Sequence, residues 1–356
     1  MKEKCTVNTG YENYNALDLA KFVFAFFIIA IHIAPASSTD TTVKFILLHV
    51  ISRVAVPFYF ACSGFFFFRK LSFKNGKILN CNENRTRLLL YCKRLVLLYS
   101  FWSAVYLLWQ IPQWYFAGTL TPHSFLDFFI SFFLDASYYH LWYLLATLFA
   151  VPAVYLFLSM VRIKFLAAIA ICFYLFGVFS YSYFWIDLPV TAAASRVNDF
   201  LRIFGIALFR AFPFITVGVF AEKYRFRLRM RASASLALIC LTLCAVEAFL
   251  LKNLTENQTH FSYLFFTLPT AFFIFYTLKS CKLGKRKNNL YPMLRKLSTF
   301  IYCVHPLVLN VLSLALDCQK YQTAAYLIVA AGSALLGVLI VKLSSKKYLS
   351  GLKYLY

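Results

Sequence analysis

Acidic residues are scarce in this chain of 356 residues, where 13 Asp and Glu stand against 36 Lys and Arg. Charged residues of both signs make up only 14%, whereas hydrophobic residues make up 62%. That apolar content is well above the roughly 45–50% that is usual in soluble domains, so a soluble fold is excluded. The sequence also has no CxxC pair and no HxxxH spacing. We therefore expect no metal site and no bound cofactor.

Long hydrophobic runs occupy most of the chain. A helix needs about 20 apolar residues to cross a bilayer. This criterion predicts an all-α, polytopic integral membrane protein with about ten transmembrane helices. The expected spans are residues 17–36, 43–68, 91–111, 138–161, 164–184, 201–221, 232–251, 260–279, 298–317 and 322–343. Residues 1–356 are thus expected to form a single membrane-embedded domain, with a cytoplasmic leader (1–16) and a cytoplasmic tail (344–356). Residues 124–134 are too short to span and are expected in the interface.

The distribution of basic residues indicates the orientation. Alternate connections, counted from the N-terminal leader, hold 28 Lys and Arg, and the opposite connections hold 4. The positive-inside rule therefore predicts cytoplasmic N- and C-termini in a plasma membrane, most simply a bacterial inner or cytoplasmic membrane. Because the charge is divided among separate loops, the net charge of +23 does not indicate nucleic-acid binding. Membrane lipids are the expected surroundings.

Two ionisable residues, Lys21 and His32, interrupt the first expected span. Eleven residues rotate an α-helix by about 1100°, which leaves a remainder of about 20°, so both lie on one face, about 16 Å apart along the axis. An ammonium at the cytoplasmic end can bind a phosphate, and a deeper imidazole can act as a general base. The alternative interpretation is that Lys21 snorkels to the headgroups and His32 makes a structural hydrogen bond.

The sequence around these residues resembles the membrane-bound acyltransferase 3 family, whose first span carries a basic residue, ten residues and a histidine. Lys21 and His32 match that signature. Further stretches are similar to family patterns in the same order, namely "SRVAVPFYFACSGFFFFRK", "YYHLWYLLATLF", "FRAFPFITVGVF" and "STFIYCVHPLVL". The resemblance implies a transmembrane O-acyltransferase. Its co-substrate would be acyl-CoA, usually acetyl-CoA, and its acceptor a hydroxyl of a cell-envelope glycan or related surface molecule.

The candidate site residues fall into three groups. Those predicted to be catalytic are His32 and Arg53, those predicted to bind the donor are Lys21, Ser63 and Arg210, and candidates for the acceptor side are His140, Trp142, His305 and Glu247. Arg210 lies near the middle of a span, a costly position that demands a partner, and Glu247 could form an ion pair with it. The small pair Ser63–Gly64 equally fits close helix packing.

Structural alternatives remain open for the acceptor-side residues. Trp142 fits an aromatic belt at the membrane surface. His305 precedes Pro306, which frees a backbone carbonyl, so His305 also fits a satisfied core histidine. A metal site made by His32, His140 and His305 is disfavoured because no acidic ligands accompany them.

Two other functions compete with acyl transfer. A membrane transporter or flippase of a small polar or glycan substrate would use the same buried charges as a pathway, and membrane parts of serine racemases are relatives linked with such roles. A scaffold for an envelope assembly would have no use for the deep basic residues, which are costly in a bilayer. If acyl transfer needs a second carrier step, the resemblance implies an extracytoplasmic partner enzyme.

Overall fold

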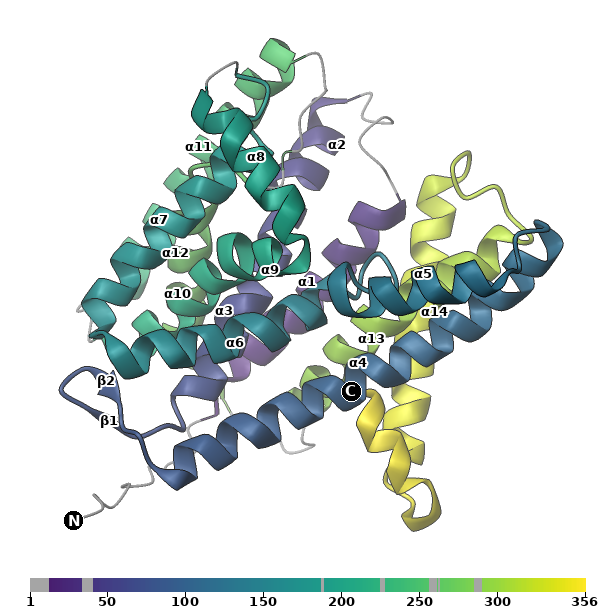
Figure 1. The fold of residues 1–356 in the computed structure, drawn as a ribbon, viewed down its shortest axis with the longest axis horizontal. Coiled ribbons are helices and arrows are strands. Elements are labelled where there is room, and N and C mark those ends of the chain that lie inside the picture. Colours follow the sequence, from purple (N-terminus) through teal and green to yellow (C-terminus); the bar gives the residue numbers. More distant parts are fainter. Residues whose placement is uncertain are drawn as a thin grey trace.

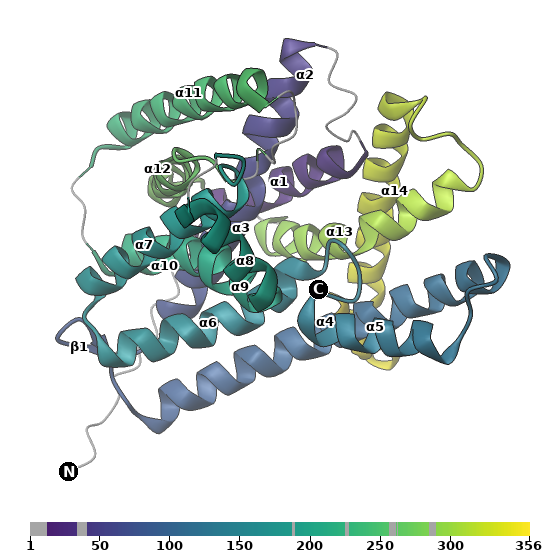
Figure 2. The same ribbon diagram turned by 45° about the horizontal axis from the view of Figure 1, so that its top comes forward.

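A computed structural model describes residues 13–33, 41–186, 189–224, 228–255, 261, 263–284 and 290–356 (Figures 1 and 2). These residues are almost entirely helical, and two short strands, β1 (Phe73–Lys74) and β2 (Lys77–Ile78), form an antiparallel pair. The predicted all-α fold is confirmed. Residues 1–12 of the expected leader lie outside the described part of the chain.

Nine helices among the described residues are long and apolar enough to cross a membrane, so the protein is a multi-pass membrane protein. They are α1 (Asn15–Ile33); the continuous run α2 (Thr42–Ile46), η2 (Leu47–Ile51), η3 (Ser52–Val54) and α3 (Ala55–Phe68); α4 (Asn82–Phe116); α6 (Trp142–Met160); α7 (Ile163–Tyr181); the run α9 (Ile203–Ile206), η4 (Ala207–Ala211) and α10 (Phe212–Lys223); α11 (Met230–Thr255); α13 (Leu290–Ser313); and α14 (Gln322–Leu343).

The remaining helices are shorter. The eighth expected span, 260–279, corresponds to α12 (Thr267–Ser280), which has only 14 residues and is not among the nine long helices. Positions 260 and 262 of that span lie outside the described residues. The segment expected in the interface forms α5 (Pro122–Leu134). Figure 1 shows α5 beside the C-terminal part of the long helix α4. Two further elements are α8 (Pro189–Leu201) and η5 (Lys347–Leu355).

Two of the long helices depart from α geometry just before a proline. The run that ends in α3 contains the π-helical segment η2 and the 3-10 segment η3, followed by Pro57. The run that ends in α10 contains the π-helical segment η4, followed by Pro213. Proline lacks an N–H and crowds the preceding turn, so the regular ladder of hydrogen bonds cannot continue through it. Arg53 and Arg210 lie in these irregular segments.

Helices α3 and α10 cross at very short range. A Cβ atom on Gly64 would collide with the backbone carbonyl of Ile215, and one on Gly218 would collide with the carbonyl of Ala61. Small residues allow such backbone approach between membrane helices. The interpretation of Gly64 as a packing residue is confirmed, and the contact fixes the rotation of α3 and hence the direction of the adjacent Ser63.

Candidate active site

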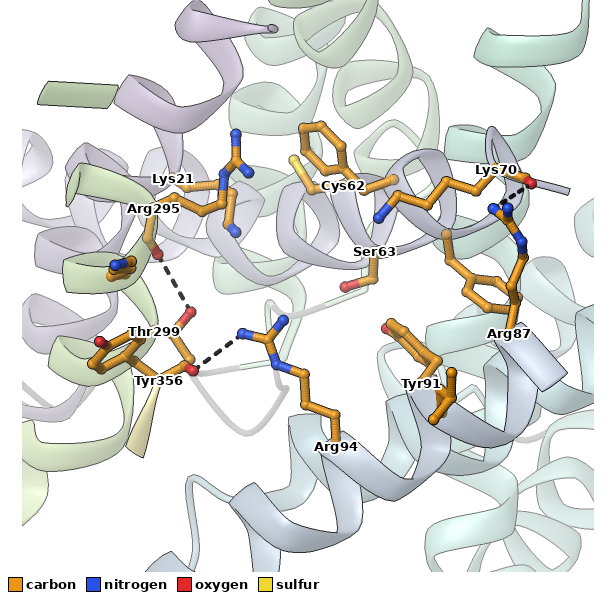
Figure 3. Close-up of a pocket in the computed structure, with 14 residues that line it drawn as sticks. Lys21, Cys62, Ser63, Lys70, Arg87, Tyr91, Arg94, Arg295, Thr299 and Tyr356 are labelled. Atoms are coloured by element: carbon orange, nitrogen blue, oxygen red, sulfur yellow. Dashed lines mark hydrogen bonds between the residues drawn. The ribbon is translucent and has the colours of Figure 1, made fainter. Parts of the chain in front are cut away.

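A basic cavity of about 460 Å³ lies between α1, α3, α4 and α13 (Figure 3). Its cationic lining residues are Lys21, Lys70, Arg87, Arg94, Arg295 and Lys296. Figure 3 shows Arg94 from α4 and Ser63 from α3 directed into the space between the helices. Lys21 and Ser63, both predicted to bind the donor, therefore line one cavity.

Most of these cations were assigned by the sequence only to the orientation of loops. Arg87, Tyr91 and Arg94 follow the spacing i, i+4, i+7 along α4 and line the cavity together. Arg295 and Thr299 on α13 have the spacing i, i+4 and line the cavity as well. Residues with this spacing share one helix face, so the pattern was a signal that could have identified them.

One cavity cation is neutralised within the protein. Arg295 donates to both carboxylate oxygens of the buried Asp18, with its Nε 2.7 Å from Oδ1 and an Nη 2.6 Å from Oδ2. Within the described chain, no ion pair joins the other five cations to an Asp or Glu side chain. Two of them donate to main-chain oxygens: Arg87 to that of Lys70 at 2.8 Å, and Arg94 to that of Tyr356, the last residue of the sequence, at 3.1 Å.

The surplus of positive charge affects Lys70, which lies beyond the end of α3. Partial burial lowers the pKa of Lys70, and the neighbouring guanidinium groups of Arg69 and Arg87 lower it further. A lowered lysine pKa means that the protonated form is disfavoured in this position. A polyanion bound in the cavity would remove that cost.

A narrower cavity of about 170 Å³ continues inward from the basic one. The two share six lining residues, Lys21, Ser63, Tyr91, Arg94, Thr299 and Tyr356. The Ser63 hydroxyl lies 2.9 Å from the Tyr143 hydroxyl, and Tyr59 donates to the carbonyl of Lys21. The inner end is lined by Tyr59, Tyr143 and Tyr302. The lining thus changes from cations to neutral hydroxyl groups along the path.

Beyond Tyr302, three histidines from distant parts of the sequence lie together. The ring centroid of His305 is 5.3 Å from that of His32 and 5.4 Å from that of His140. Tyr302 donates to the carbonyl of His140, which connects the inner cavity to this cluster. The three rings do not form a metal-binding group, and none was found among the described His, Cys, Asp and Glu residues.

Backbone carbonyls determine the tautomers of two of these histidines. Nδ1 of His305 lies 2.8 Å from the carbonyl oxygen of Tyr302, which Pro306 leaves without its helical partner, so Nδ1 carries the proton. Nε2 of His140 lies 3.2 Å from the carbonyl oxygen of Cys303. A carbonyl oxygen can only accept a hydrogen bond, so Nε2 of His140 carries the proton. The other nitrogen of each ring is buried without a hydrogen-bond partner and is an acceptor. His32 is only half-buried and is the accessible member of the cluster.

The other predicted residues lie elsewhere. Arg210 is not among the residues that line the two cavities, and its guanidinium lies 3.4 Å from the ring centre of Tyr181. Its expected ion pair with Glu247 is wrong. The Glu247 carboxylate is engaged instead by the Tyr183 hydroxyl at 2.7 Å and by backbone N–H groups, because the chain before α12 folds back onto it.

Arg53 lies in η3, and η3 packs against α1, the helix that carries His32. Trp142 is the first residue of α6, and its ring packs against Phe60 at 6.0 Å. The predicted residues thus separate into a basic cavity near Lys21 and a second group around His32.

This arrangement can hold an elongated polyanion by one end and bring its other end to a base. The cavity cations suit phosphate groups. The hydroxyl groups of Tyr59, Tyr143 and Tyr302 in the narrower cavity offer hydrogen bonds that suit a neutral amide-containing arm. Neither of these two cavities is lined by a histidine among the described residues, but Tyr302 donates to the carbonyl of His140 and so links the narrower cavity to the histidine cluster, where an imidazole can accept a proton from a hydroxyl.

Comparisons with known proteins agree with this arrangement. The family model described as acyltransferase domain, of the acyltransferase 3 family, matches residues 14–343. Two curated proteins of Enterococcus faecalis, both named amino-acid racemase, are 28% identical over 79% of this chain and 26% identical over 93% of it. The chain spans only 38% and 46% of the lengths of these relatives. No solved structure is significantly similar. The chain belongs to the acyltransferase 3 family and is a multi-pass membrane protein.

Proposed function

We propose that this enzyme moves an acyl group, acetyl in the simplest case, from acyl-CoA in the cytosol to a hydroxyl of a cell-envelope glycan or related surface molecule. The observation that carries the proposal is the basic cavity that narrows into a tyrosine-lined passage. CoA has the matching form, with phosphate groups at one end and a neutral pantetheine arm that ends in the thioester.

The positive-inside rule puts the basic cavity on the cytoplasmic side, because its cations belong to the connections rich in Lys and Arg. Lys21 and Arg94 would bind donor phosphates. The arm would cover the distance of about 16 Å that separates Lys21 from His32 along α1. The acceptor would then approach His32 from the opposite side, in a bacterial cytoplasmic membrane.

In the chemical step, His32 takes the proton from the acceptor hydroxyl, and the oxygen attacks the thioester carbonyl. The carbon–sulfur bond breaks, the acyl group remains on the acceptor oxygen as an ester, and CoA leaves as the thiol after receiving the proton. Arg53 lies in η3, which packs against the helix that carries His32, and its positive charge would oppose negative charge that develops during the attack.

The test is turnover of labelled acetyl-CoA by the full chain in lipid nanodiscs, together with the O-acetyl content of surface polysaccharide in cells. We expect His32→Ala to reduce acetyl transfer by about 100-fold or more, since general base catalysis contributes about 10²–10⁴-fold. Normal O-acetyl content in cells that make His32→Ala at the wild-type level would refute the role.

The racemase names of the two relatives favour one alternative, in which the protein transports a small polar substrate such as an amino acid. The same nanodisc preparation separates the two functions. Consumption of acetyl-CoA with formation of an ester supports acyl transfer. Uptake of a labelled amino acid into liposomes without any consumption of acetyl-CoA supports transport.

A further inference from the structure

Arg53 and Arg210 each lie in a membrane-spanning helical run, and neither lines the basic cavity. Arg210 is 8% exposed and has aromatic rings on two sides, with its guanidinium carbon 3.4 Å from the ring centre of Tyr181 and 4.9 Å from that of Tyr263. Arg53 interacts electrostatically with Arg210 and Tyr181, and its Nε atom is buried without a hydrogen-bond partner.

The two guanidinium groups have no acidic partner among the described residues. The described ion pairs involve neither of them, and the nearby carboxylate of Glu247 already accepts hydrogen bonds from Tyr183, Phe265 and Phe266. Aromatic faces attract a cation but carry no net negative charge. The two like charges at membrane depth thus have no carboxylate partner within the described part of the chain, where Arg210 hydrogen-bonds to the Tyr181 side chain, and charges at this depth are costly.

The backbone is shaped around both residues. Arg53 lies in the 3-10 segment η3 directly after the π-helical segment η2, and Arg210 lies in the π-helical segment η4. Short π-helical segments within α-helices are rare and occur frequently at functional sites. Two separate membrane helices thus lose their regular geometry at these two arginines, as is frequent at functional sites.

We propose that Arg53 and Arg210 together bind an anionic group of the acceptor, a carboxylate or a phosphate, and hold its hydroxyl at His32. This inference rests on the proposed function, which requires an acceptor but does not identify its class. The guanidinium fork pairs bidentately with both kinds of anion. The segment η3, which carries Arg53, packs against α1, so an anion on Arg53 would lie against the helix that carries the proposed base.

The first experiment measures acetyl transfer by the full chain in phosphatidylcholine nanodiscs, with pairs of acceptors that differ in charge. The pairs are ethanolamine and L-serine, glucose and glucuronate, and glycerol and glycerol 3-phosphate. We expect the anionic member of at least one pair to have a kcat/KM about tenfold higher than its neutral partner. Preference for glucuronate or serine identifies a carboxylate, and preference for glycerol 3-phosphate identifies a phosphate.

Variants link this preference to the two arginines. Arg53→Gln and Arg210→Gln should reduce the ratio of the paired kcat/KM values to about one, while Arg196→Gln should leave it unchanged. Arg196 is exposed and donates to the carbonyl of Ala192. Its replacement by Gln therefore removes the same charge as the other two variants, but from the surface of the protein. Equal use of charged and neutral acceptors by the wild type, or an unchanged ratio in both Gln variants, would overturn the inference.

The second experiment does not depend on acetyl transfer. Thermal unfolding is followed with CoA at saturation, which fills the basic cavity, in acetate, phosphate or chloride of equal ionic strength. Acetate or phosphate should raise Tm of the wild type by about 2–4 °C relative to chloride. The rise should be absent in Arg53→Gln and present in Arg196→Gln. In chloride, Arg53→Gln should melt no lower than the wild type, because one of two repelling charges is removed.

The outcomes separate the inference from the proposed function. If acetyl-CoA is consumed but no anion preference or Tm rise depends on Arg53, the inference fails and the acyl transfer stands. If the Tm rise depends on Arg53 but acetyl-CoA is not consumed, the arginine site stands and acyl transfer fails. A Gln variant that melts well below the wild type in chloride shows a structural role and also counts against the inference.

Discussion

Replacement of Arg94 by Gln tests the basic cavity most directly. The Arg94 guanidinium is directed into the cavity from α4, and no Asp or Glu side chain among the described residues pairs with it. Loss of a hydrogen bond to a charged group costs about 1.5–3 kcal/mol. The KM for acetyl-CoA should therefore rise by roughly 10- to 150-fold, with a smaller change in kcat.

Lys93 provides the matched control because it is the preceding residue on the same helix, carries the same charge and does not line either cavity. An exposed charge of this kind contributes about 0.2–1 kcal/mol, so Lys93→Gln should change KM by less than about fivefold. Both variants remove one positive charge, so a larger rise in KM for Arg94→Gln than for Lys93→Gln is due to the position of Arg94 in the cavity.

The chemical counterpart is acetyl-pantetheine, a donor with the same thioester and arm but without the nucleotide phosphates. With this donor, Arg94→Gln and the wild type should have the same KM, because the group that Arg94 binds is missing. Steady-state acetyl transfer in nanodiscs provides the KM for each donor. Thermal unfolding of Arg94→Gln shows whether loss of the hydrogen bond to Tyr356 changes the stability of the protein. An equal rise in KM for both donors would refute phosphate binding by Arg94.

Three further predictions follow from packing and charge. Gly218→Ala should lower the free energy of unfolding by about 1–3 kcal/mol, because a Cβ there meets backbone atoms of α3. Thermal unfolding in detergent measures this change. Gly284→Ala is the control and should leave the free energy of unfolding unchanged, because the space around Gly284 is open. The lowered pKa of Lys70 implies that the Kd for CoA, measured by calorimetry, rises as pH increases through that pKa, whereas Lys70→Arg stays flat. The phosphates are already ionised there. Asp18→Asn should cost about 1.5–3 kcal/mol in the same melts through the lost bidentate pair with Arg295, and unchanged stability would contradict that pair's structural role.

The spacing of residues within one helix is sufficient to predict part of the candidate site. Lys21 and His32 share a face of α1 because eleven residues nearly complete three turns. The same reasoning applied to Arg87, Tyr91 and Arg94 on α4 would have identified a wall of the cavity. Those arginines were interpreted only as loop charges, because the positive-inside rule already accounted for them.

The spacing of residues within one helix does not predict which side chains meet between helices. Glu247 was expected to pair with Arg210, as the single Glu deep in a span, yet the chain before α12 supplies its hydrogen bonds and leaves Arg210 against Tyr181 and Tyr263. A choice among polar partners depends on which segments fold together. Composition alone has no information on that choice.

The sequence by itself determined the class of fold and the face that carries Lys21 and His32, because hydrophobicity and helical period are properties of short segments. The tertiary structure decided that cations of α4 and α13, together with Lys70 beyond the end of α3, line one cavity with Lys21. It also brought His140 and His305 to His32 from positions more than 100 residues away. Such groupings arise only when helices pack, since each depends on the rotation and crossing of two helices whose hydrophobic surfaces fit.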